Sequence, residues 1–181
     1  QGVSSAASDV YKRQVQFQVD VSTPPAGWIT ILSRGIYGSV DLGAAQANAL
    51  FNATGSRIVR RFCADCAASH REIYYRRITP FPAGFNMYAM LASNWTGDSN
   101  QLNIDFELYS TYADALARNP TARWAFCNYV DPVTGRGNNG VGFPYDCAPS
   151  AAAALQWQCN SFLYFYGGRD RYHVQFQAEA G

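Results

Sequence analysis

Two carboxylates stand two residues apart near the middle of the chain, as Asp105 and Glu107 in the segment Asn103-Ile104-Asp105-Phe106-Glu107. Residues two apart in a strand project from the same face, so this spacing predicts that the two carboxylates point the same way. Retaining glycoside hydrolysis uses two carboxyl groups about 5 Å apart, one as nucleophile and one as acid. The structural alternative is an amphipathic strand whose polar residues face solvent.

The same segment resembles the Glu-x-Asp-x-Glu strand motif of laminarinase-type glycoside hydrolases, which are β-sandwich enzymes. Asn103 stands where that family has its nucleophile, and an amide cannot replace a carboxylate in this role. A resemblance in fold is also weak support for a shared activity. We therefore expect a protein that is not an enzyme, with no catalytic residue and no cofactor.

Five cysteines suggest disulfides and hence an oxidising compartment. Cys63 and Cys66 form a Cys-x-x-Cys pair, whereas Cys127 and Cys147 are widely spaced. A zinc site built on the first pair and His70 would need one of the later cysteines, but structural zinc usually shows a second closely spaced pair of ligands. We expect instead a Cys63–Cys66 disulfide, a Cys127–Cys147 disulfide and no bound metal.

Two Asn-x-Thr sequons, at Asn52 and Asn94, agree with passage through a secretory compartment. Cys159 is left over, either as a buried free thiol or as a bridge to another molecule. Together the cysteines and the sequons predict a secreted, extracellular glycoprotein with N-glycans on Asn52 and Asn94.

Charge and hydropathy narrow the range of partners. Only 15% of the residues are charged and the net charge is +1, whereas proteins that bind nucleic acids usually carry a basic patch or stripe. No apolar run approaches the roughly 20 residues that cross a bilayer. We therefore expect neither a nucleic-acid partner nor a membrane span.

Alternation of apolar and polar residues dominates the chain and predicts half-buried strands. Short helices are expected at 44–51 and 112–117, the second capped by Ser110 or Thr111, while residues 85–91 are ambiguous. Many short strands separated by turns predict an all-β fold, an antiparallel β-sandwich of jelly-roll type with two or three short helices. The predicted strands are 15–21, 28–32, 57–62, 72–78, 102–109, 124–129, 161–166 and 174–180.

Residues 1–14 differ in composition from the rest and resemble a translated adapter artefact common in environmental transcript collections. We interpret them as an artefact or an unstructured leader. On this interpretation, the natural start of the protein and any signal peptide precede the sequence. Residues 15–25 are then a strand with a proline linker, and residues 26–181 form a single domain.

The two ends of the chain nearly repeat each other, since residues 15–21 read Val-Gln-Phe-Gln-Val-Asp-Val and residues 174–180 read Val-Gln-Phe-Gln-Ala-Glu-Ala. The simple interpretation is that both strands pair within one sandwich. The alternative is donor-strand exchange, in which the N-terminal strand of one molecule completes the sheet of the next. Thr23-Pro24-Pro25 would then act as a stiff spacer. The pocket-filling residues of the donor strand would be Val15, Phe17, Val19 and Val21.

Four segments between roughly residues 57 and 165 carry a family resemblance. They are Cys66 with His70-Arg71-Glu72-Ile73-Tyr74-Tyr75-Arg76-Arg77, Asp105-Phe106-Glu107-Leu108-Tyr109-Ser110-Thr111-Tyr112, Phe126-Cys127-Asn128-Tyr129 and Gly142-Phe143-Pro144-Tyr145-Asp146-Cys147. Through these segments the chain resembles a group of uncharacterised secreted β-sandwich proteins of algae, protists and environmental sequence sets, among which are subunits of glycan-coated extracellular fibres. The resemblance implies a secreted sandwich and no established activity, and Cys159 departs from the pattern.

We therefore expect a structural subunit that assembles with copies of itself. Exchange of a strand between molecules is a heterologous contact and generates an open helical filament unless it closes into a ring. The rival hypothesis is a secreted carbohydrate-binding module of lectin-like sandwich type, in which aromatic side chains stack on sugars. The alternative role of these aromatic side chains is to fill the core. They are Tyr74, Tyr75, Trp95, Trp157, Tyr164 and Tyr166.

Overall fold

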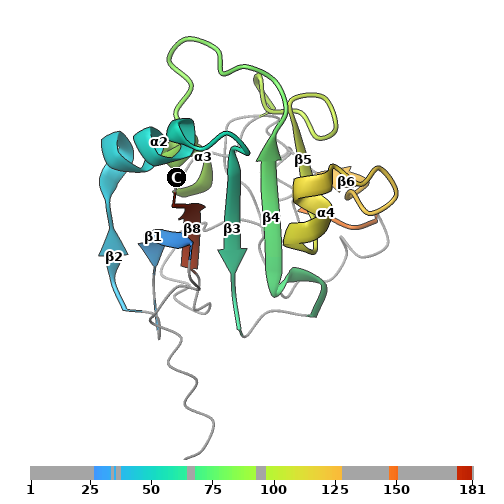
Figure 1. Cartoon of the computed structure of the whole chain (residues 1–181), viewed down its shortest axis with the longest axis horizontal. Helices are drawn as coiled ribbons and strands as arrows, with labels where there is room; N and C mark the ends of the chain where they lie inside the picture. The colour runs from blue at the N-terminus through green and yellow to red at the C-terminus, as the bar shows by residue number, and fades with distance from the viewer. Residues whose placement is uncertain are drawn as a thin grey trace, which may run out of the picture.

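The computed structural model describes residues 27–33, 35, 38–64, 68–92, 97–127, 147–150 and 175–180. Within them a six-stranded antiparallel sheet has the strand order β2-β1-β8-β3-β4-β5, and a separate two-stranded sheet pairs β6 with β7 (Figure 1). The strands are β1 (Trp28–Ser33), β2 (Val40–Asp41), β3 (Ile58–Phe62), β4 (Glu72–Arg77), β5 (Phe106–Tyr109), β6 (Phe126–Cys127), β7 (Cys147–Ala148) and β8 (Gln175–Glu179). The helices are α2 (Gly43–Ala53), η2 (Ala68–His70, a 3-10 turn), α3 (Met87–Ala92) and α4 (Tyr112–Ala117).

The last strand of the chain is an inner strand of the sheet. β8 lies between β1 and β3 and is antiparallel to both (Figure 1). Phe176 lies opposite Leu32 on one side and Arg61 on the other. β8 therefore joins parts of the chain more than a hundred residues away from it, and without it β1 and β3 would have no common neighbour.

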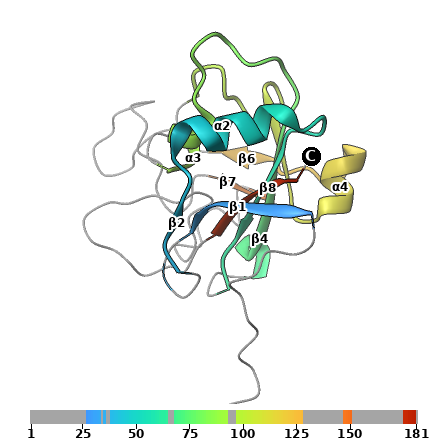
Figure 2. The ribbon, with the colours of Figure 1, turned by 60° about the vertical axis from the view of Figure 1, so that its left-hand side comes forward.

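One face of the sheet packs against α2 and α3, which lie side by side (Figure 2). The Phe51 ring from α2 lies 5.3 Å from Phe81 and 6.2 Å from Tyr75 on β4. Because side chains alternate across a strand, every second residue of the inner strands enters this core. Its buried members on the sheet include Leu32, Val59, Ile73, Tyr75, Phe106, Leu108, Phe176 and Ala178.

The opposite face carries α4 at the end formed by β4 and β5 (Figure 1). A smaller cluster of Ile58, Tyr74, Tyr109 and Ala115 is buried there. The helix begins as its sequence predicts, because the Thr111 hydroxyl accepts the Asp114 amide proton at 3.2 Å.

Most of the predicted elements are present. Strands expected at 28–32, 57–62, 72–78 and 174–180 correspond to β1, β3, β4 and β8, and the helices expected at 44–51 and 112–117 correspond to α2 and α4. The ambiguous residues 85–91 contain most of α3. The fold is thus β-rich and antiparallel with short helices. The strands expected at 15–21 and 161–166 lie outside the described residues.

Two expectations about strands were wrong. The segment 102–109 is not one strand, because residues 103–105 form a turn in which Asn103 has a φ of 62° and pairing begins at Phe106. The strand expected at 174–180 is not half-buried either, since Gln175 and Gln177 of β8 are 3% and 0% exposed. Both faces of β8 are buried, Phe176 and Ala178 in the core beside α2 and the two glutamines on the opposite face, which alternation alone does not reveal.

Candidate functional site

The carboxylate of Glu107 is held by three neighbours. Nε and Nη2 of Arg118 each donate to it at 3.0 Å, and the Tyr109 hydroxyl donates at 2.9 Å. Arg123 forms a further ion pair at 3.5 Å. Burial alone raises the pKa of Glu107, but the hydrogen bonds from Arg118 and Tyr109 outweigh burial and hold the pKa below its usual value. Glu107 is therefore a stably ionised anchor for the segment after α4.

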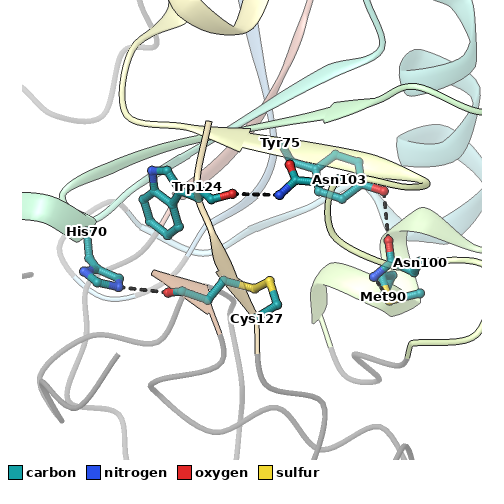
Figure 3. Close-up of a disulfide and its surroundings, with 8 residues drawn as sticks. His70, Tyr75, Met90, Asn100, Asn103, Trp124 and Cys127 are labelled. Atoms are coloured by element: carbon teal, nitrogen blue, oxygen red, sulfur yellow. Dashed lines mark hydrogen bonds between the residues drawn. A yellow bond between two sulfur atoms is a disulfide. The ribbon is translucent and has the colours of Figure 1, made fainter. Parts of the chain in front are cut away.

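Asp105 belongs to a different set of contacts. It accepts the Thr79 hydroxyl at 3.1 Å and the Gln101 amide at 3.0 Å, and it lies 3.6 Å from Arg77. The side chain of Asn103 donates to the carbonyl of Trp124 at 3.0 Å (Figure 3). The alternation that would place Asp105 and Glu107 on one face is broken by the turn before β5. Among the described contacts the two carboxylates therefore share no hydrogen-bond or ion-pair partner.

The Cys127–Cys147 disulfide joins β6 to β7, as the sequence led us to expect. His70 lies beside it, donating from Nε2 to the Cys147 carbonyl at 3.0 Å and contacting Trp124 at 5.3 Å between ring centroids (Figure 3). Burial lowers the pKa of His70, and the charge of Arg61 lowers it further against the effect of the carbonyl. A neutral imidazole therefore holds the disulfide against the sheet.

The zinc alternative loses its ligands in this arrangement. Disulfide sulfurs are not thiolate ligands, so neither Cys127 nor Cys147 can complete a zinc site. Cys63 is disulfide-bonded as well. In the described part of the chain, no group of three or more His, Cys, Asp or Glu side chains is placed to hold a metal ion. Cys66, the predicted partner of Cys63, lies outside the described residues.

The first sequon lies at the end of α2. The Asn52 side chain is exposed there, and its Nδ2 donates to the Asn48 carbonyl at 2.8 Å. Exposure is what attachment of a glycan requires. The second sequon, at Asn94, lies outside the described residues.

A shallow hollow of 330 Å³ lies next to the disulfide. Turn 101–104 forms one side of it, and Ala125 and Cys127 form the other. One polar atom near this hollow, Oδ1 of Asn103, is buried without a hydrogen bond. None of the described residues that line the hollow is charged, so these residues offer a ligand only a few polar contacts.

The most unusual chemistry of the described residues is a row of buried polar side chains across the middle of the sheet. The Gln175 amide donates to the Thr30 hydroxyl at 2.8 Å. The Gln177 carbonyl accepts from Nη1 of Arg60 at 2.7 Å. Arg60 also binds Glu72 at 3.0 Å, and its guanidinium lies 4.9 Å from the Phe62 ring. The row occupies the face of the sheet opposite α2.

Two donors in this polar row are not satisfied. Nε2 of Gln177 and Nε of Arg60 are buried and have no hydrogen-bond partner. A buried polar group without a partner is rare in folded proteins and destabilises the state that contains it. Each of these two donors, one on β8 and one on β3, therefore lowers the stability of the packed sheet.

An aromatic cluster borders the polar row. The Trp28 ring lies 5.4 Å from Tyr112 and 6.1 Å from Tyr74. The hydroxyl of Tyr112 donates to Glu179, and the hydroxyl of Tyr74 donates to Glu72 at 2.6 Å. Burial and the bond to Glu72 raise the pKa of Tyr74 to about 12. The cluster thus places two partly exposed rings, Trp28 and Tyr112, and the buried Tyr74 next to carboxylates.

The predicted site residues fall into three groups. Cys127 and Cys147 are joined, Cys63 is in a disulfide and Asn52 is exposed. Of the expected aromatic platform, Tyr75 belongs to the core and only Tyr74 lies in the aromatic cluster. Those outside the described residues are Val15, Phe17, Val19, Val21, Cys66, Asn94, Trp95, Trp157, Tyr164 and Tyr166.

The sequence interpretation missed the part played by Gln177 and Glu179. One signal could have found them, because the repeated Gln-Phe-Gln marks a strand whose polar residues are as regular as its apolar ones. Comparison of the chain with protein-family models, with curated proteins and with solved structures gave no match. Any function must therefore be argued from the arrangement of the residues themselves.

Proposed function

We propose that the protein is a non-enzymatic structural subunit of an extracellular, glycosylated filament, assembled head-to-tail by exchange of a β-strand between copies. One observation carries the proposal. β8 comes from residues 175–179, yet it lies between β1 and β3, and its Gln-Phe-Gln sequence occurs again at residues 16–18. The chain thus carries two similar segments, residues 15–21 and 174–180, and only one strand fits between β1 and β3.

The spare strand supplies a link between molecules. Backbone hydrogen bonds give such a link its affinity, and alternate side chains in pockets give it specificity. A donor at one end of the molecule and an acceptor in the sheet form a heterologous contact, which propagates into a filament. Disulfides at Cys63 and at Cys127–Cys147 suit such a subunit outside the cell.

The proposal includes the finer features of the fold and its surface. We place the six-stranded sheet in a jelly-roll-like sandwich, because Gln175 and Gln177 are buried on the face opposite α2. N-glycans on Asn52 and Asn94 would coat the assembled filament. The exposed position of Asn52 at the end of α2 supports this assignment.

Electron microscopy of the secreted protein, without chemical crosslinking, tests the proposal. The full chain should form regular filaments that survive dilution. Deletion of residues 15–22 should abolish them while circular dichroism still reports a folded sheet. Deletion of residues 1–14 is the matched control and should leave assembly intact. Uniform single particles for the full chain would refute the filament.

The aromatic cluster favours a second candidate, a carbohydrate-binding module. Sugar sites combine aromatic faces with hydrogen-bonding carboxylates, and Trp28, Tyr112 and Glu179 offer both. A glycan array would then show binding that Trp28→Ala removes. Tyr88→Ala, on α3 at the other face of the sheet, is the control and should keep that binding. This candidate predicts a monomer throughout.

A further inference from the structure

We propose that the place of β8 in the sheet, between β1 and β3, accepts residues 15–21 of a second copy of the chain in the register of β8. This inference rests on the proposed strand exchange and names its acceptor. The acceptor place is bounded by Trp28–Ser33 on one side and by residues 59–62 on the other.

The core face of this place selects a phenylalanine. Phe176 is 1% exposed, and it lies opposite Leu32 in the register of β1 and β8. Phe17 follows one Gln and precedes another, as Phe176 does, so it enters the same pocket when the two strands are superposed. A shift of one residue would send it to the polar face, and a shift of two would put Val15 or Val19 in this pocket, so only the register of β8 places a phenylalanine there.

The polar face selects the residues on either side of that phenylalanine. Gln175 bonds Thr30, and Gln177 bonds Arg60. Gln16 and Gln18 carry the same amides at the same spacing from Phe17. Glutamines are seldom buried in the middle of a sheet. The position between β1 and β3 buries two of them, and the N-terminal segment supplies two at the same spacing.

The ends of the two strands also correspond. Glu179 accepts from the hydroxyls of Tyr112 and Ser56, and Asp20 supplies a carboxylate at the matching position. The two segments differ at three positions, and besides the shorter Asp20 and the larger Val21 the difference that reaches the core is Val19, which stands where β8 has Ala178, a fully buried residue. Its two additional methyl groups must be accommodated by small movements of the core.

Replacement of β8 by residues 15–21 of a second copy exchanges one strand for another of similar sequence. Each strand makes the same ladder of backbone hydrogen bonds to β1 and β3, so these bonds are broken and re-formed in equal number. Exchange of near-identical elements between copies is the low-cost route to assembly known from domain swapping.

A second copy is favoured over the chain's own N-terminal segment by the connection to β1. The Ala180 amide donates to the Gly27 carbonyl at 2.7 Å, and Val21 matches Ala180. Residues 15–21 of the same chain, in this register, would need a five-residue loop, 22–26, with Thr23-Pro24-Pro25 at its centre. A residue before proline is held extended, and a Pro-Pro pair favours a straight polyproline conformation. Residues 22–26 therefore disfavour the tight reversal of the chain that would pair residues 15–21 with β1 of the same molecule.

A labelled peptide tests the register directly. The peptide has the sequence of residues 15–21 with a photoreactive phenylalanine analogue at position 17, and it is incubated with the full chain before irradiation. Mass spectrometry should find the label on peptides that contain Leu32 or Arg61, the neighbours of Phe176. A peptide with Gln16 and Phe17 exchanged has the same composition and should not bind. An unlabelled peptide of residues 174–180 should compete.

Because β8 fills this place in the isolated chain, the labelling is repeated on Phe176→Ala, in which β8 is held less well. Circular dichroism checks that this variant folds, and Gln175→Ala replaces it if it does not. Labelling should increase in the loosened variant. Absence of the label from both Leu32 and Arg61 in every chain would overturn the inference.

The outcomes separate this inference from the proposed function. Filaments that depend on residues 15–22, with the label on Val40–Asp41 of the edge strand β2, would keep the filament and overturn the acceptor. The label at Leu32 or Arg61 in a chain that never forms filaments would support the acceptor and refute the filament.

Discussion

The side-chain carbonyl of Gln177 accepts a hydrogen bond of 2.7 Å from Nη1 of Arg60, and the two residues are directly opposite each other on β8 and β3. Both are buried, at 0% and 8% exposure. A last strand that enters the middle of a sheet is therefore tied to its neighbour by side chains as well as by backbone.

Removal of this bond should destabilise the fold. Arg60→Leu leaves the Gln177 amide without a partner, and a buried amide of this kind costs about 1–3 kcal/mol of unfolding free energy. Urea denaturation of Arg60→Leu, Gln177→Leu and the double variant measures the coupling. The double variant should lose less than the sum of the single changes, because no polar group is left unpaired. Strict additivity would contradict a direct bond.

Reduction of the Cys127–Cys147 disulfide should also weaken the fold. The bond closes a loop between residues 20 apart in sequence. Chain-entropy arguments put the stabilisation from a loop of this length at about 3 kcal/mol. The variant with both cysteines changed to alanine should show a lower midpoint of urea denaturation than the parent. An unchanged midpoint would mean that the pairing of β6 with β7 does not depend on the bond.

Acid should destabilise the protein through His70. Its pKa is lowered in the fold, so the unfolded chain binds a proton first as the pH falls below the ordinary value of 6.5. Stability is then complete above that pH and is lost progressively below it, down to the pKa of the folded state. Thermal melts across this range, with His70→Gln as a variant that keeps a donor but does not titrate, check the assignment. The variant should show a flatter response to pH.

Alkali should act through the tyrosines beside the carboxylates. The pKa values of Tyr74 and Tyr109 are each raised to about 12, chiefly by burial and by their bonds to Glu72 and Glu107. Because the unfolded chain ionises from a pKa of 10.0, stability falls as the pH rises above that value. Ultraviolet titration of tyrosinate should show Tyr74 and Tyr109 among the late-ionising groups, and Glu72→Gln and Glu107→Gln should each lower the pKa of one of them only in part, because burial remains. Early ionisation in the parent would contradict the two hydrogen bonds.

Glu107→Gln should affect stability and leave no change in hydrolysis. The substitution removes the charge that binds Arg118 and Arg123, and loss of a charged hydrogen bond costs about 1–3 kcal/mol. Hydrolysis of a β-glucan should be undetectable in the parent, in Glu107→Gln and in Asp105→Asn. Activity in the parent that disappears in both variants would restore the glycosidase interpretation.

Local elements were predictable because their signals are local. Thr111 before an alanine-containing segment predicts the start of α4, and the aromatic and β-branched residues of 57–62 and 72–78 predict β3 and β4. The prediction that Asp105 and Glu107 share one face was wrong, because it assumed that 102–109 is an unbroken strand. Asn103 in the left-handed region breaks it, and Asn tolerates that conformation better than most residues.

The sequence alone determined the antiparallel, β-rich character of the chain, its short capped helix and the near-identity of residues 15–21 and 174–180. Only the tertiary structure decided that β8 lies between β1 and β3 and that Gln175 and Gln177 are buried. The reason is physical. Alternation along a strand reports which residues share a face, but burial depends on what lies beside and across that strand, and those neighbours come from more than a hundred residues away.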